Sequence, residues 1–324
     1  MAVKIRIEIK IQFLFLLETM SGPECLPLKT WEAVEEWTEG EDDLCISTIP
    51  LAEREPRSPN TPQTLLCHDM RGGYQQDRFV QGCGDVDSYR FYHWQYIDMF
   101  IYFSHYFVSI PPPTWTNAAH RNGVKMLGTE WDDGLKRCQQ LLQSEDTYKT
   151  FADKLVRITK YYKFDGWLVN IENKIEEDKV QRLCDFVAYL TEKMHSEIPG
   201  SKVIWYDSVI NTGELKWQDE LNEKNCMFFD ACDGIFLNYN WKDETLINSK
   251  CDATKKGRAM DVFVGIDVFG RGCLGGGGFN TIETHKLPCD KGLRKCLIHI
   301  VPVSSLPKTD KVFPDITDQI YAYK

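Results

Sequence analysis

Short apolar segments alternate with longer helical segments through most of this 324-residue chain. Residues 144–160 and 178–198, rich in Lys, Glu, Leu and Gln, have the composition of helices. The strand-like segments are residues 64–69, 97–104, 124–128, 166–172, 203–208, 234–241 and 262–269. Strands that alternate with helices predict a parallel sheet with helical crossovers, and seven of them favour a closed barrel over an open sheet.

A complete (β/α)8 barrel needs an eighth strand, for which residues 295–301 are the single candidate. The composition changes after the glycine run at 275–278, and residues 284–288 are a poor helix. We therefore expect an α/β fold, a TIM-type (β/α)8 barrel whose eighth strand is in question and whose Pro-rich N-terminal leader is poorly ordered. The expected domains are an irregular extension at 1–62, the barrel at 63–281 and a divergent tail at 282–324.

Composition and charge exclude several functions. The net charge of −10, from 38 basic and 48 acidic residues, disfavours a nucleic-acid groove. The 12 cysteines form no Cys-x-x-Cys pair and no Cys/His cluster, so neither a metal nor a redox cofactor is expected. The apolar run at 11–17 is too short to span a membrane and lacks a cleavage site after it, which favours a cytosolic protein.

The segment 161–172 ends in an amide and a carboxylic acid, Asn170 and Glu172. Side chains alternate across a strand, so these two point to the same face, roughly 7 Å apart along the backbone. At the carboxyl end of a barrel strand they stand where such enzymes carry their active sites. The alternative is that Asn170 begins a loop and Glu172 is a solvated acid that caps a helix.

Eight sequence blocks, taken together and in their order, resemble glycoside hydrolase family 85, the endo-β-N-acetylglucosaminidases, and within it the cytosolic vertebrate type. The resemblance covers about residues 62–281. The blocks are residues 67–74, 91–94, 102–105, 164–172, 205–208, 217–222, 238–241 and 265–272.

This resemblance implies an enzyme that cuts the β-1,4 bond between the two core GlcNAc residues of N-glycans, whether free or attached to peptides or proteins. The family's Asn-x-Glu motif falls on Asn170 and Glu172. Most retaining glycosidases place a second carboxylate about 5 Å away as nucleophile, whereas here an amide takes that place. The resemblance implies that the substrate's own 2-acetamido oxygen attacks and gives an oxazoline. Asn170 would orient the acetamido group, and Glu172 would act as acid and then as base.

The resemblance implies further contacts with the substrate. Tyr206 would touch the acetamido or oxazoline group, unless it is a buried core tyrosine. Trp217 and Trp241 would stack on sugars, unless they pack at the barrel rim. His105, Asp207, Asn238 and Asp267 lie near strand ends and would line the pocket.

Competing interpretations are weaker, and the chain departs from the family in two places. Chitinase-type enzymes carry an acid where Asn170 stands, and a serine hydrolase would need a Gly-x-Ser-x-Gly elbow, which is absent.

Residues 127–131 are shorter than in the vertebrate enzymes, which would remove part of the sugar-binding wall. The family's later segments are not recognisable after residue 281. A second hypothesis is therefore a truncated, catalytically impaired form that at most binds glycan.

Overall fold

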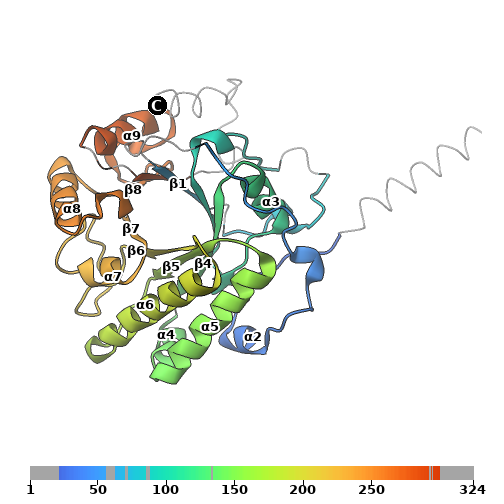
Figure 1. Cartoon of the computed structure of the whole chain (residues 1–324). Helices are drawn as coiled ribbons and strands as arrows, with labels where there is room; N and C mark the ends of the chain where they lie inside the picture. Colours follow the sequence, from blue (N-terminus) through green and yellow to red (C-terminus); the bar gives the residue numbers. More distant parts are fainter. Residues whose placement is uncertain are drawn as a thin grey trace, which may run out of the picture.

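The computed structural model describes residues 22–55, 63–69, 72–84, 88–132, 134–291, 293 and 295–299. Eight parallel strands form a barrel enclosed by helices (Figure 1). They are β1 (Gln63–Asp69), β2 (Met99–Phe103), β4 (Lys125–Asp132), β5 (Gly166–Ile171), β6 (Lys202–Tyr206), β7 (Gly234–Leu237), β8 (Val262–Ile266) and β9 (Lys295–His299). The short β3 (Val108–Ser109) adds to β4 in antiparallel orientation. The predicted TIM-type fold is confirmed, and all seven predicted strand segments are strands.

The barrel closes through β9. Its backbone is paired in parallel with β8 on one side and β1 on the other, so that Lys295 stands in register with both Phe263 and Gln63. Closure removes the exposed edges that an incomplete barrel would have. The doubt about the eighth strand was therefore wrong, and the barrel includes residues that the sequence analysis assigned to a C-terminal tail. The composition of this segment also predicts that Ile298 and Ile300 pack loosely, but their side chains lie outside the described part of the structure.

A helical layer surrounds the strands. Its helices are α3 (Pro113–Arg121), α4 (Leu135–Leu141), α5 (Glu145–Tyr162), α6 (Val180–Glu197), α7 (Cys226–Ala231), α8 (Asp243–Lys255) and α9 (Thr281–Asp290). Single 3-10 turns are η1 (Asp43–Cys45), η2 (Gln76–Arg78), η3 (Trp94–Tyr96), η4 (Glu177–Lys179), η5 (Ala259–Asp261), η6 (Leu274–Gly276) and η7 (Gly278–Asn280). None of the described helices combines the length and apolar composition that a bilayer crossing requires.

The helix α9 covers residues 284–288, which were expected to be a poor helix. Thr284 donates from Oγ1 to the carbonyl oxygen of Leu274, at 2.7 Å, and so attaches the helix to the glycine-rich loop. Leu287 packs on the hydrophobic core, and Leu293 just beyond the helix is buried within it. Tertiary packing therefore outweighs the low helix propensity of a segment that contains Pro288.

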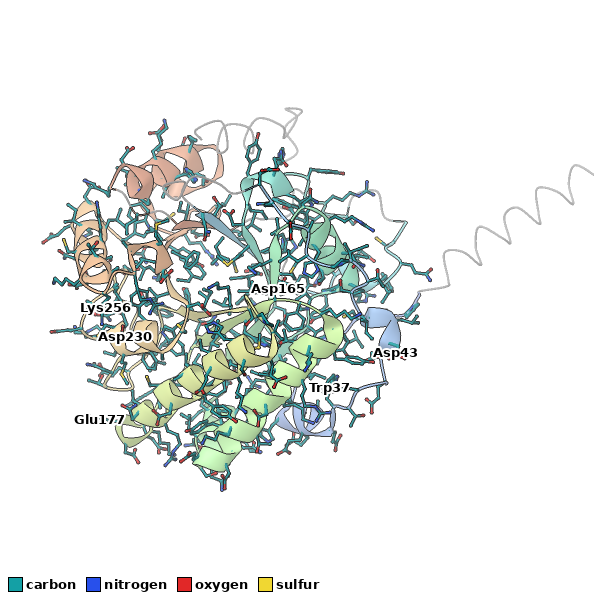
Figure 2. All side chains as sticks on the ribbon, viewed as in Figure 1. Trp37, Asp43, Asp165, Glu177, Asp230 and Lys256 are labelled. Carbon is teal, nitrogen blue, oxygen red and sulfur yellow. The ribbon has the colours of Figure 1, made fainter. Side chains whose placement is uncertain are left out.

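The start of β5 is fixed by two residues. A Cβ atom at Gly166 would lie 1.9 Å from the carbonyl oxygen of Lys202, so only glycine allows β5 to approach β6 this closely. Asp165, near the centre of Figure 2, accepts hydrogen bonds at Oδ2 from the Met126 amide (2.7 Å) and from His120 Nε2 (2.8 Å). These contacts set the register that carries Asn170 to the far end of the strand.

Residues 22–55 pack against the outside of the barrel and do not form the loosely attached leader that was expected. The helix α2 (Trp31–Glu36) buries Trp31, whose ring stacks on Phe151 of α5 at 5.1 Å. Trp37, labelled in Figure 2, donates from Nε1 to the Tyr162 hydroxyl at 3.2 Å. Aromatic burial of this kind outweighs the lack of sequence periodicity.

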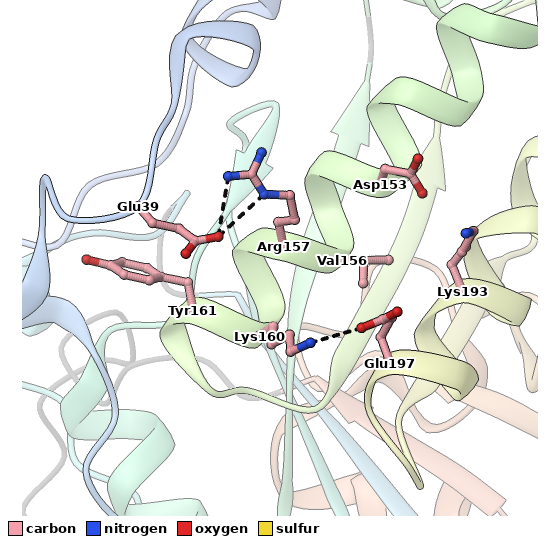
Figure 3. Close-up of a pocket in the computed structure, with 8 residues that line it drawn as sticks. All are labelled: Glu39, Asp153, Val156, Arg157, Lys160, Tyr161, Lys193 and Glu197. Atoms are coloured by element: carbon pink, nitrogen blue, oxygen red, sulfur yellow. Dashed lines mark hydrogen bonds and ion pairs between the residues drawn. The ribbon is translucent and has the colours of Figure 1, made fainter.

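A groove of about 610 Å³ lies where the N-terminal segment, α5 and α6 meet (Figure 3). Ion pairs cross it, from Arg157 to Glu39 at 3.3 Å and from Lys160 to Glu197 at 2.9 Å. Lys160 and Glu197 stand just before β5 and β6 begin, so the groove is at the amino ends of the strands. In barrels of this type, that end is opposite the catalytic one.

Candidate active site

A layer of buried apolar side chains fills the barrel interior. It consists of Leu65, Cys67, Met99, Ile101, Phe103, Leu127, Leu168, Ile204, Tyr206, Phe236 and Phe263, with the half-buried Trp131 and Tyr239 packed against it. These residues come from seven strands and alternate along each strand, as inward-facing positions do. Because Leu168 faces inward, Asn170 and Glu172 on the same face of β5 lie above this layer, at the carboxyl end of the barrel.

Asn170 and Glu172 differ in exposure. Asn170 is 4% exposed, and within the described part of the molecule its side-chain oxygen has no hydrogen-bond partner. Glu172 follows the last residue of β5 and is half-buried. Its backbone amide donates to the carbonyl oxygen of Asp132 at 2.8 Å. A buried acceptor that lacks a donor, beside a solvent-accessible acid, is an arrangement suited to receiving a ligand.

Trp131 contacts the acid directly. It stands beside Asn170 in the register of β4 and β5, and its Nε1 donates to Glu172 Oε2 at 3.0 Å. Its ring packs against His105 with centroids 5.3 Å apart. β4 continues to Asp132 and places an indole at this position. The expectation that the shorter segment at 127–131 removes part of the sugar-binding wall stays a prediction.

Tyr206 begins a hydrogen-bonded chain across the next two strands. Its hydroxyl donates to Asn238 Oδ1 at 2.9 Å, and Asn238 Nδ2 donates to Asp219 Oδ1 at 2.7 Å. Burial, followed by the nearby charge of Glu172, raises the pKa of Tyr206 well above its usual value. The Tyr206 hydroxyl is therefore a neutral group close to the acid.

Asp207 is fully buried and holds the loop that follows β6. Its Oδ2 accepts from the amides of Gln218 (3.0 Å) and Asp219 (2.8 Å), and its Oδ1 accepts from Asn225 Nδ2 at 3.0 Å. Burial raises its pKa to about 7, although these donors lower it. The loop that it holds carries both Asp219 and Trp217.

The other residues predicted for the site occupy different surroundings. Trp217 is 44% exposed on that loop, and His105 is exposed at the rim above β2. Trp241 is buried, and its Nε1 donates to the Gly265 carbonyl oxygen at 2.6 Å. Asp267 is buried as well and accepts at Oδ2 from the backbone amide and Nε of Arg271, both at 2.9 Å. The structure thus brings Asn170, Glu172 and Tyr206 together, with Asn238 beside Tyr206.

Sequence reasoning gave no role to Trp131, Asp219 or Tyr239. Trp131 ends the segment 127–131, which was interpreted as shorter than in the vertebrate enzymes. Its position at the end of a strand was the one signal that could have identified it. Asp219 has a positive φ of 57°, a conformation that a sequence does not show. Tyr239 lies directly after Asn238 and interacts with the Tyr206 hydroxyl. In the described part of the chain, no group of three or more His, Cys, Asp or Glu residues is placed to hold a metal ion.

The family model for glycosyl hydrolase family 85 matches residues 74–300. The chain belongs to glycosyl hydrolase family 85. The resemblance noted in the sequence is thereby confirmed. The match includes β9, the strand that closes the barrel.

Family 85 relatives are similar over most of this chain. The Cytosolic endo-beta-N-acetylglucosaminidase of Gallus gallus is 50% identical over 258 residues, which cover 78% of this chain and 35% of the relative. Its Homo sapiens counterpart is 50% identical over 252 residues, covering 76% and 34%. The glycoside hydrolase domain of Endo-D from Streptococcus pneumoniae R6 superimposes with a TM-score of 0.74 and 25% identity, over 93% of this chain and 50% of that one. The chain spans about a third of the length of these curated relatives.

Proposed function

We propose that this family 85 chain is an endo-β-N-acetylglucosaminidase, which hydrolyses the GlcNAc-β-1,4-GlcNAc bond of the N-glycan core. One observation carries the proposal. Asn170 and Glu172 leave β5 on one face, and in the described structure the amide has a buried oxygen without a partner. A substrate amide is the natural complement of such an oxygen, and the 2-acetamido group of GlcNAc is one.

Asn170 acts by orienting that acetamido group. Its Oδ1 accepts the hydrogen bond of the acetamido N–H, which turns the acetamido oxygen toward the anomeric carbon. Attack by a group held in place replaces a bimolecular encounter and lowers the barrier by several kcal/mol, up to about 10 in the best-aligned systems. The product of this step is an oxazoline or oxazolinium, so the reaction retains configuration.

Glu172 supplies the proton transfers. In the first step it protonates the glycosidic oxygen of the leaving GlcNAc. In the second step, as a carboxylate, it deprotonates the water that opens the oxazoline. Its half-buried position at the end of β5 gives access both to the sugar and to water.

The remaining residues divide into two groups by position: one group lies beside the acid or is exposed at the rim, and the other holds neighbouring loops and strands. We assign substrate contacts to Tyr206, Asn238, Trp217 and His105, with Trp217 offering an exposed ring to a sugar face. Asp207, Asp267 and Trp241 are buried, and their polar atoms contact neighbouring loops and strands. They influence the substrate through the segments that they hold.

The substrates that we propose are N-glycans, either free or carried by glycopeptides and glycoproteins, and the compartment is the cytosol. The names of the animal and plant relatives, each a cytosolic endo-beta-N-acetylglucosaminidase, support both assignments. The net charge of −10 is consistent with a neutral sugar ligand and not with a nucleic acid. The chemistry requires no cofactor.

The test uses the purified chain and a high-mannose glycopeptide. Mass spectrometry should show a released glycan with one GlcNAc at its reducing end and a peptide that keeps one GlcNAc. NMR of the fresh product should show the β-anomer. No product after a day at micromolar enzyme would overturn the proposed activity, and an initial α-anomer would overturn the oxazoline route.

A further inference from the structure

Trp131 touches the proposed acid through a directed hydrogen bond. Its Nε1 lies 3.0 Å from Glu172 Oε2. The ring is held in place, because it packs on His105 and His105 in turn packs on Phe103, with centroids 5.4 Å apart. An indole fixed in this way presents its N–H in one direction only.

An indole N–H donates and cannot accept a hydrogen bond, and the carbonyl oxygen of a carboxylic acid is a better acceptor than its hydroxyl oxygen. The bond from Trp131 to Oε2 therefore favours the form in which Oε2 carries no proton. The acidic proton is then on Oε1. We propose that Trp131 is a positioning residue for Glu172, which assigns the proton to Oε1 and turns that oxygen toward the glycosidic bond. The inference rests on the proposed function.

The same contact serves the second step. Once Glu172 has given up its proton, the Trp131 N–H stabilises the carboxylate that must accept a proton from water, because a hydrogen bond to an ionised group is stronger than one to a neutral group. The backbone of Glu172 is held from the same side. Both its amide and Asn173 Nδ2 donate to the Asp132 carbonyl oxygen at 2.8 Å. Strand β4 thus fixes the acid at two points.

The kinetic test is Trp131→Phe, which keeps an aromatic ring and removes the donor. We expect kcat on the glycopeptide to fall by about tenfold, with KM changed less than about twofold. The alkaline limb of the kcat/KM profile should move up by about one pH unit, because the carboxylate loses a stabilising donor. A residue that merely formed part of the sugar-binding wall would raise KM and leave the limb unchanged, and that result would overturn the inference.

Trp205→Phe is the matched control. Trp205 is fully buried on β6, and its Nε1 has no hydrogen-bond partner among the described residues. The substitution therefore removes the same atoms without a directed contact to the acid, and the pH limb should stay where it is in the wild type. An equal shift in both variants would show that the effect comes from packing and would also overturn the inference.

A second measurement does not depend on turnover. In an ¹⁵N-labelled wild-type chain, the indole N–H resonance of Trp131 should titrate with pH, and in Glu172→Gln this dependence should disappear. A Trp131 resonance that is independent of pH in the wild type overturns the positioning role, whether or not the chain is active. If the Trp131 resonance titrates in a chain that releases no glycan, the contact with Glu172 is supported and only the proposed activity is overturned.

Discussion

The polar groups in the two halves of the candidate site differ in their hydrogen bonding. On the β6–β7 side, Tyr206, Asn238 and Asp219 form a continuous hydrogen-bonded chain, anchored by the loop that Asp207 holds. On the β4–β5 side, the oxygen of Asn170 has no partner within the described structure. The difference shows where a substrate is needed to complete the site. The tyrosine side is assembled in advance, and the amide and acid side keeps capacity for a ligand.

Two buried carboxylates sharpen this contrast. Asp207 accepts from backbone amides and from Asn225. Glu130, on β4, is equally buried, yet neither of its side-chain oxygens has a hydrogen-bond partner in the described molecule. Burial, followed by the charge of Asp132, raises the pKa of Glu130 well above its usual value. Two equally buried carboxyl groups therefore have opposite effects: Asp207 orders a loop, whereas Glu130 destabilises the fold.

The largest effect is expected at the acid. Glu172→Gln keeps the shape of the side chain and removes its proton, so glycan release should fall by about 10²-fold or more. Initial rates on the glycopeptide measure this directly. An unchanged rate would show that the acid lies elsewhere, and the β4–β5 side would lose its assigned role.

Asn170→Ala tests whether the unpartnered amide serves the substrate. Attack on a native glycan should be lost, because the acetamido group is no longer oriented. A preformed sugar oxazoline should still be used as donor, since the step that needs Asn170 is already complete. Comparing the two donors with one enzyme preparation separates the outcomes, and equal loss with both would contradict the role given to Asn170.

The sequence was sufficient for most of the barrel, because its strands are buried on both faces and read as continuous apolar runs. It also located Asn170 and Glu172, which depend only on the alternation of side chains along one strand. It did not predict the packing of Trp31 onto Phe151, a contact between residues far apart in the chain. The closure by β9 depends likewise on pairing with β1, over more than two hundred residues.

The same limit applies within the site. Trp131 meets Glu172 only because β4 and β5 adopt one particular register, and a segment that read as shortened gave no reason to expect it. Asp207 and Asp267 were predicted to line a pocket from their positions near strand ends. Whether such a carboxylate faces a ligand or holds a loop is decided by amides ten or more residues away, as with Asp207 and Asp219, or by a neighbour such as Arg271.

On the preassembled side, Asp219 is the group to change. Asp219→Ala removes the acceptor that orients the Asn238 amide, so the Tyr206 hydroxyl loses its fixed partner, and kcat should fall by about tenfold. Asp219→Asn keeps a side-chain oxygen and should restore part of the rate. Asp230→Ala is the control, because it breaks only the exposed ion pair with Lys256 (Figure 2) and should leave kcat unchanged. Full activity in Asp219→Ala would show that the β6–β7 chain does not matter for turnover.

Glu130→Leu is expected to have the smallest effect on activity. It should nevertheless change the stability of the fold clearly. A buried acid without donors destabilises the fold, so its removal should raise the free energy of unfolding by about 1–3 kcal/mol near neutral pH. Because the pKa of Glu130 is raised in the folded chain, the native state keeps its proton while the unfolded chain releases it above about pH 4.3. The wild type should therefore lose stability as pH rises from about 5, at up to about 1.4 kcal/mol per unit.

The gain from Glu130→Leu should accordingly be larger at pH 8 than at pH 5, as measured by denaturant unfolding at both values. The matched change on the other side is Asp207→Leu, which leaves two backbone amides and Asn225 without their acceptor and should lower the free energy of unfolding by about 2–4 kcal/mol. Glycan release by Glu130→Leu should stay within about twofold of the wild type, because Glu130 alternates with the inward-facing Trp131 and so lies on the other face of β4. If both substitutions destabilised the chain equally, Glu130 would have an effective partner, and the contrast between the two buried carboxylates would fail.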